Sequence, residues 1–270
     1  TAMGYASLYS NTTGGSNTAM GHVSLYSNTT GGGNTANGAD ALHHNKTGSW
    51  NTSNGSRSLY FNESGSYNTA NGSQALYINS AGSYNIADGA YALVNNTTGN
   101  SNTAVGGNAL YSNTTGYSNT ALGKDALNKN TTQSNLVAVG DSSLYNNSSG
   151  MWNTAIGSKA LFANNTGFLN TALGNHALFD NGGGARNTAI GAYSLPANTT
   201  ADNNTAIGTY ALSANTSGNG NTAAGVNALG ANFSASNNSA FGLNALLSNN
   251  TGSANAALGA LALEQNTSGQ

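Results

Sequence analysis

Side chains that could bind a metal or transfer a proton are few in this chain. The 270 residues include four histidines, eight acidic side chains and no cysteine. The histidines are His22, His43, His44 and His176. No acidic residue recurs at a fixed distance from the histidines, as a recurring metal or catalytic cluster would require. Asp40, Asp125 and His176 come nearest, but they are separated by 85 and 51 residues. We therefore predict no enzyme activity, no metal and no cofactor.

A second candidate chemistry is glycosylation of asparagine. The motif Asn-x-Ser/Thr recurs along the chain, for example at Asn113, Asn198 and Asn215, and this motif accepts N-linked glycans. The same letters also describe a turn, because Asn bonds to its own backbone two residues later and the following Gly accepts a positive φ. Asn198 or Asn215 would carry a glycan only if its side chain points outward. Both interpretations remain open from the sequence.

The element that positions all these residues is a repeat of 17 residues. Glycine recurs at this interval from Gly4 to Gly259 without insertion or deletion, which makes sixteen units. A fixed period of this length is typical of a solenoid, in which each unit forms one coil. We predict an all-β parallel β-solenoid, or β-roll, of about 16 coils of 17 residues. Residues 1–270 are expected to form a single repeat array without separate domains.

Each predicted coil has two short strands, roughly Asn-Thr-Ala-x-Gly and Ala-Leu-x-x-Asn, joined by two turns. The fourth residue after each Gly is always Leu, and we expect this column to form the core ladder. Its members are Leu8, Leu25, Leu42, Leu59, Leu76, Leu93, Leu110, Leu127, Leu144, Leu161, Leu178, Leu195, Leu212, Leu229, Leu246 and Leu263.

Asparagine forms two further columns. The seventh residue after each Gly is always Asn, and a second Asn column opens the next strand, interrupted once by Leu136. Coils one strand spacing apart, ~4.8 Å, allow such amides to bond to one another along the axis. We predict a turn ladder that includes Asn11, Asn28, Asn113, Asn164, Asn215 and Asn266.

The residue before the Gly changes character along the chain. It is Met at Met3 and Met20, polar at Asn37, Asn54, Asn71 and Asp88, and apolar in all ten later units. The column lies either inside the coil, with the polar run as a local Asn ladder, or outside as a stripe buried against another chain. Under the second interpretation the candidate interface is formed by Val105, Leu122, Val139, Ile156, Leu173, Ile190, Ile207, Phe241 and Leu258.

The residue after the core Leu is often aromatic. It is Tyr or Phe in eight units, namely Tyr9, Tyr26, Tyr60, Tyr77, Tyr111, Tyr145, Phe162 and Phe179. A column of this kind forms a stacked surface ladder, a chain-to-chain contact or a stripe that touches carbohydrate. We favour ladder or interface packing over a ligand-binding role.

Composition excludes several partners. Charged residues make up 5% of the chain and the net charge is −2, so there is no basic surface for nucleic acid. The chain also lacks a run of about 20 apolar residues, so we do not expect it to insert into a membrane. The chain starts inside a repeat at Thr1, and it is expected to be a mature product or a piece of a longer fibre whose ends pack on more of the same. End-to-end stacking into a filament is the other interpretation.

The repeat resembles a known family. Asn135 to Gly140, followed by Ser143, is similar to the Asn-Ser-Val-Ala-Ile-Gly-x-x-Ser motif of YadA-like heads of trimeric autotransporter adhesins. The form at Asn153 to Leu161 resembles repeats of phage tail fibres and long bacterial surface proteins. The resemblance implies a left-handed, trimeric β-roll on a cell or virion surface. The family's unit of ~14–15 residues is shorter than this one.

These observations favour a structural and adhesive extracellular fibre, or filament shaft, whose main partner is itself. Outward loops would contact a surface receptor or glycan. The alternative is an ice-binding β-solenoid, which needs a flat face of regularly spaced hydroxyls. The Thr column at Thr171, Thr188, Thr205 and Thr222 suggests this, although its neighbours on the strand, such as Leu173, are apolar.

Overall fold

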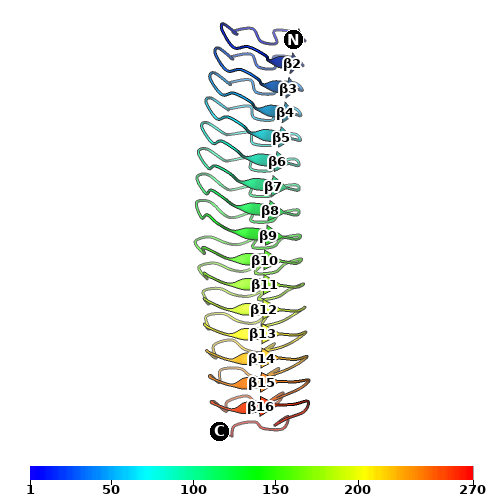
Figure 1. Ribbon diagram of the computed structural model, residues 1–270, viewed down its shortest axis with the longest axis vertical. Helices are drawn as coiled ribbons and strands as arrows, with labels where there is room; N and C mark the ends of the chain where they lie inside the picture. Colours follow the sequence, from blue (N-terminus) through cyan, green and yellow to red (C-terminus); the bar gives the residue numbers. More distant parts are fainter. Residues whose placement is uncertain (270) are drawn as a thin grey trace. The chain divides into compact units, whose positions relative to one another are not determined.

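The protein is an all-β parallel β-solenoid of about 15 turns with about 17 residues per turn, as predicted from the repeat. The computed structural model describes residues 1–269 (Figure 1). Within this range there is no helix, and so none that could cross a membrane. The chain divides into two compact units, Thr1–Asn135 and Leu136–Gln270, and each is described by itself.

The first unit contains eight short parallel strands, one in each coil. Equivalent residues of successive coils pair directly, for example Thr52 with Thr69. The strands are β1 (Ala2–Met3), β2 (Thr18–Met20), β3 (Thr35–Asn37), β4 (Thr52–Asn54), β5 (Thr69–Asn71), β6 (Ile86–Asp88), β7 (Thr103–Val105) and β8 (Thr120–Leu122).

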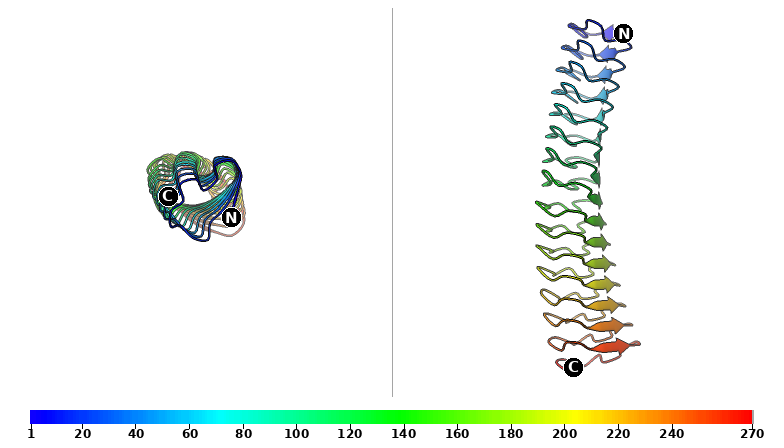
Figure 2. Two further views of the ribbon diagram at one scale, coloured as in Figure 1. Left: turned by 90° about the horizontal axis from the view of Figure 1, so that it is seen from above. Right: turned by 60° about the vertical axis from the view of Figure 1, so that its left-hand side comes forward.

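The second unit repeats this arrangement. Figure 2 shows the strands of each unit aligned along one side of its coils. The strands are β9 (Val137–Val139), β10 (Thr154–Ile156), β11 (Thr171–Leu173), β12 (Thr188–Ile190), β13 (Thr205–Ile207), β14 (Thr222–Ala224), β15 (Ser239–Phe241) and β16 (Ala256–Leu258).

The second predicted strand, Ala-Leu-x-x-Asn, is not a strand, and each coil has one strand rather than two. The core Leu has a left-handed backbone, with φ of 52° at Leu178, and so does the residue two positions earlier, with φ of 54° at His176. This segment still bonds along the axis, as from the Leu25 amide to the Ala41 carbonyl at 2.9 Å. A left-handed L-residue costs ~1–2 kcal/mol, and burial of the Leu offsets that cost.

The core of each coil is thin and consists of the Leu and two small residues, namely the Ala or Ser directly before the Leu and the residue in the middle of the strand. Leu42, Leu110 and Leu178 are fully buried, as are the alanines that precede them. Leu8 is half-buried and Leu263 is half-exposed. The Ala in the middle of each strand points into the same core, for example Ala172. The one exception to that Ala column, Ser53, is buried and donates its hydroxyl to the Ser58 carbonyl at 2.9 Å.

Candidate functional site: the strand face and its supporting ladders

The outward side chains of the strands form one continuous surface in each unit, which we call the strand face. In every complete strand the central residue is buried and the two flanking residues are partly exposed, as in β11, where Ala172 is buried and Leu173 is 44% exposed. This follows from the two-residue alternation of a strand. The column before the Gly therefore lies outside the coil, and the interpretation that placed it in the core is wrong.

The strand face of the second unit carries no charge, and the column before the Gly is apolar throughout. In strands β9 to β16 the residue before the Gly is always apolar, and the other outward residue is Thr, Val, Ser or Ala. Seven of the predicted interface residues lie in this column, which they share with Ala224. They are Val139, Ile156, Leu173, Ile190, Ile207, Phe241 and Leu258, and Leu258 is 86% exposed. Phe241 and Leu258 also line a hollow of about 290 Å³ with Ser239 and Ala256.

The strand face of the first unit has a polar segment between apolar flanks. Val105 and Leu122, the two remaining predicted interface residues, lie on β7 and β8. Before them the column holds Asn37, Asn54 and Asn71 and then Asp88. The Asn37 amide donates to Asn54 Oδ1, and the Asn54 amide donates to Asn71 Oδ1, both at 2.9 Å. The predicted local Asn ladder exists, but it lies on the surface.

A buried ladder of amides joins the turns of successive coils. The predicted turn Asn residues are fully buried in the interior coils. Each amide donates to the carbonyl oxygen of the equivalent Asn one coil earlier, as from Asn181 Nδ2 to Asn164 Oδ1 at 2.8 Å. The same amide also donates to the backbone carbonyl three residues later, which belongs to Gly in most units, as from Asn181 Nδ2 to the Gly184 carbonyl at 2.7 Å. Both hydrogens of the amide are therefore used.

The second Asn column bonds mainly to the backbone. Asn170 Oδ1 accepts the backbone N–H of Asn187 at 2.9 Å, and Asn170 Nδ2 donates to the Gly184 carbonyl at 2.8 Å. The Gly184 carbonyl thus receives one amide from each Asn column. Buried polar groups are tolerated when all their hydrogen bonds are made. The two columns therefore hold neighbouring coils together, the first through bonds between side-chain amides and the second through bonds from side-chain amides to the backbone.

Burial of these amides removes the glycosylation interpretation of the recurring motif. Asn198 and Asn215 are both fully buried, so a glycan cannot be attached to either side chain in the folded chain. The residue directly after the Asn, the middle position of the motif, also takes part in the turn, because the Thr199 hydroxyl donates to the Thr216 carbonyl one coil further at 3.1 Å. Here the motif builds the turn of the coil.

The aromatic column is a face-to-face stack. Tyr9, Tyr26, His43, Tyr60 and Tyr77 follow one another with ring centroids 5.1 to 5.3 Å apart and interplanar angles of 3° to 23°. In the second unit Tyr145, Phe162 and Phe179 stack in the same way. Stacking on a sugar requires a free ring face. Neighbouring rings cover the faces inside these stacks, so the carbohydrate-contacting interpretation loses its basis there.

His43 is the member of this stack that the sequence prediction left out. It occupies the same repeat position as the tyrosines, and equal spacing would have identified it. Its Nδ1 is buried and has no hydrogen-bond partner. Burial, followed by the charge of the neighbouring His44, lowers the pKa of His43 below its ordinary value of 6.5. His43 therefore remains in the stack most stably as the neutral ring.

The other histidines also serve in stacks. His22 lies against Tyr5, His44 against Phe61, and His176 between Phe179 and Tyr193. Burial, and then the charge of Lys159, lower the pKa of His176. Within residues 1–269 no three His, Cys, Asp or Glu side chains approach closely enough to hold a metal ion.

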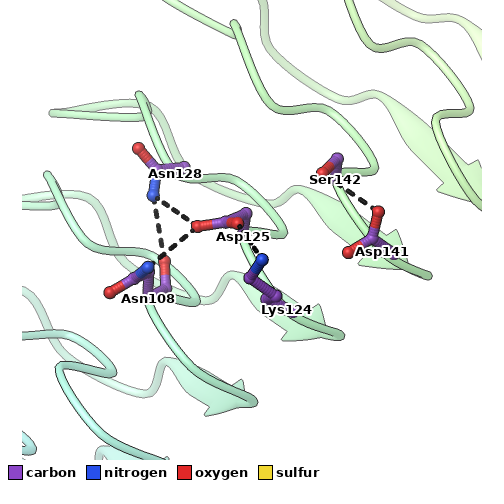
Figure 3. A network of polar contacts seen from close by, with 6 residues as sticks. All are labelled: Asn108, Lys124, Asp125, Asn128, Asp141 and Ser142. Atoms are coloured by element: carbon purple, nitrogen blue, oxygen red, sulfur yellow. Dashed lines mark hydrogen bonds and ion pairs between the residues drawn. The ribbon is translucent and has the colours of Figure 1, made fainter.

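The acidic residues in the His176 position have separate partners. Asp40 pairs with Arg57 at 3.5 Å. Asp125 accepts the Asn108 and Asn128 amides at 3.0 and 3.2 Å, and it pairs with Lys124 at 3.6 Å (Figure 3). In the second unit, the Ser142 hydroxyl donates to Asp141 at 3.2 Å. These are surface contacts between neighbouring residues or neighbouring coils, and none of them joins an acid to a base and a nucleophile.

No protein-family model matches the chain, and no curated protein matches it.

Proposed function

We propose that this chain is part of a structural and adhesive extracellular fibre that self-associates through its strand face. The observation that carries the proposal is the column before the Gly in β9 to β16, which is apolar, outward and partly exposed over the whole second unit. Contiguous exposed apolar surface of this kind is typical of an interaction site. Absence of charge on this face removes the repulsion that would separate identical copies.

The thin core supports self-association. Each interior coil buries one Leu, two small residues and two amides. A buried Leu contributes ~1.5–3 kcal/mol, while ordering the backbone costs ~1–2 kcal/mol per residue. Axial hydrogen bonds supply part of the difference, and burial of Ile156, Ile190 and Ile207 against other copies would add apolar contact without any change inside the coil.

The resemblance to YadA-like heads and tail-fibre repeats gives the proposal its finer form. It favours a left-handed trimer exposed on a cell or virion surface, in which the three strand faces meet at the axis. The variable residues after the Gly then point away from the axis and are available to a receptor or glycan. Asn175 and Val226, two of these residues, are accessible to solvent.

The mass of the native particle tests the proposal. Light scattering of the purified chain should give a multiple of 26.9 kDa. The double variant Ile190→Asp, Ile207→Asp should give the monomer mass with the circular dichroism spectrum retained, because both side chains already lie outside the coil. The control Asn175→Asp, Val226→Asp adds the same charge at accessible positions outside the strand face and should leave the mass unchanged. A monomeric parent protein contradicts self-association.

Ice binding is the second candidate. Its supporting observation is that Thr188, Thr205 and Thr222 are paired in register on the charge-free strand face of the second unit. Thermal hysteresis in dilute solution, abolished by Thr205→Lys but retained in Asn175→Lys, would favour this function over a fibre.

A further inference from the structure

We propose that the polar segment Asn37, Asn54, Asn71 and Asp88 sets the axial register in which a second copy of this chain docks on the strand face. The inference rests on the self-association proposed above. It adds a role for four side chains that an apolar stripe alone does not explain. All four occupy the column before the Gly in strands β3 to β6 of the first unit.

A repetitive interface has a register problem. Successive strands pair residue for residue, so every coil presents the same backbone at intervals of ~4.8 Å. A second copy that slides by one coil exchanges one aliphatic contact for another, and the two registers have nearly equal energies. The aliphatic part of the column, in β9 to β13, cannot distinguish them. Only positions that break the repeat can do so.

The polar segment breaks the repeat at both of its ends. Met20 precedes it and Val105 follows it. A parallel copy in register places the three Asn amides opposite amides and Asp88 opposite Asp88, so the amides favour this register while the two carboxylates repel each other. A copy that slips by one coil places Met20 opposite Asn37, and Val105 opposite the carboxylate of Asp88. An aliphatic side chain that covers a carboxylate or an amide removes the hydrogen bonds to water that its remaining donors and acceptors make, and this penalises the slipped register.

The amides of the segment are suited to a second copy of themselves. Asn54 uses one hydrogen to bond Asn71 and one lone pair to accept from Asn37. An amide has two hydrogens and two lone pairs, so one donor and one acceptor remain at Asn54. The same group on an identical chain offers the complementary pair. A single buried Asn selects register in coiled coils by the same principle.

Cysteine cross-linking tests the register directly, because the natural chain has no cysteine. Chains that carry Val105→Cys and chains that carry Leu122→Cys are co-expressed, oxidised and analysed by peptide mass. A disulfide between two Val105→Cys chains reports the in-register assembly. A disulfide that joins a Val105→Cys chain to a Leu122→Cys chain reports a slip of one coil. The experiment is repeated with Asn37, Asn54, Asn71 and Asp88 all changed to Ile, a residue the same column carries at Ile156.

With the natural segment, we expect the in-register disulfide in about tenfold excess over the slipped one. With the four Ile substitutions, we expect comparable amounts of the two. An assembly that keeps its multiple mass and its exclusive in-register disulfide after the substitutions overturns this inference and leaves the proposed function intact. Equal amounts in the natural chain overturn it as well. A monomeric natural chain, seen by light scattering, overturns both.

Discussion

At the residue scale, the fold depends on backbone conformations that most side chains avoid. The repeating Gly has a φ of 133° at Gly38, which L-residues rarely adopt. A Cβ atom at this position would lie 2.7 Å from the Gly55 carbonyl oxygen of the next coil. The Gly column therefore combines a required torsion with a close approach between coils, which is why it runs through all sixteen units.

Substitution of one such Gly tests this requirement. Gly38→Ala is expected to destabilise the protein by ~3 kcal/mol or more, because strain and a backbone collision add together. Thermal unfolding followed by circular dichroism measures the effect. The control is Gly15→Ala, where a Cβ meets nothing within 4 Å. Equal melting temperatures of the two variants would contradict the account.

At the scale of the coil, hydrogen-bonded side-chain columns replace much of the apolar core. The Asn turn ladder bonds each coil to the next, and the aromatic stack of the first unit follows the same axis. Both columns depend on equal spacing, since each member is satisfied by its neighbours. Loss of one member therefore affects the coil before it and the coil after it.

Removal of one ladder amide measures this coupling. Asn181→Ala leaves the Asn198 amide without its Oδ1 acceptor and Asn164 Oδ1 without its donor. Each unsatisfied buried group costs ~1–3 kcal/mol, so chemical denaturation should show a loss of ~2–5 kcal/mol. The solvent-accessible Asn175→Ala should stay within ~0.5 kcal/mol of the parent protein. If both variants unfold alike, the ladder does not stabilise the coil.

The histidines in the stacks make stability depend on pH. Burial lowers the pKa of His43 and of His176 below 6.5, so the unfolded chain binds protons that the folded chain does not. Their stabilising contribution is present above pH 6.5 and is lost as the pH falls through their folded pKa values. The melting temperature should therefore fall between about pH 7.5 and about pH 5. His43→Tyr should reduce this fall, and the addition of His176→Tyr should reduce it further. An unchanged pH profile in the double variant would show that these rings do not control it.

At the scale of the whole molecule, the repeat length is the main constraint. Core, amide and strand columns coincide only if every coil contains 17 residues. Stability of such an array is approximately a sum over coils and their neighbours. Deletion of a whole coil should therefore be tolerated. A deletion that is one residue shorter than a coil should displace every column after the junction.

A pair of deletions inside the second unit tests the constraint. Removal of residues 154–170 joins Asn153 to Thr171 and preserves all columns, so we expect a cooperative, folded protein with a similar melting temperature. Removal of residues 155–170 shifts the later columns by one position and turns buried Leu residues outward. We expect this shorter deletion to lose the folded coils beyond the junction. Comparable far-ultraviolet spectra for the two deletions would contradict the prediction.

The architecture follows from the repeat alone. An uninterrupted column of Leu and the constant Gly and Asn require stacked coils, because only equal positions can meet at each turn. The alternation of side chains along a strand likewise requires that Ala172 faces away from Thr171 and Leu173. These inferences need only the period and the chemistry of each column, and the buried amide bonds confirm the predicted Asn ladder.

Three features do not follow from periodicity and were found only in the folded chain: the direction in which a column faces, the backbone torsion and the orientation of the rings. Period alone does not show which side of a column faces inward, so the positions of Asn198 and of the residues before the Gly stayed open until burial was known. It also does not report backbone torsion. The Ala-Leu-x-x-Asn segment reads as a strand, yet its Leu and the residue two positions earlier both have a positive φ, so the segment is not extended as a strand is. His43 shares the repeat position of the tyrosines, but only the geometry of the stack shows that its ring lies between two of theirs, because residue type does not reveal ring orientation.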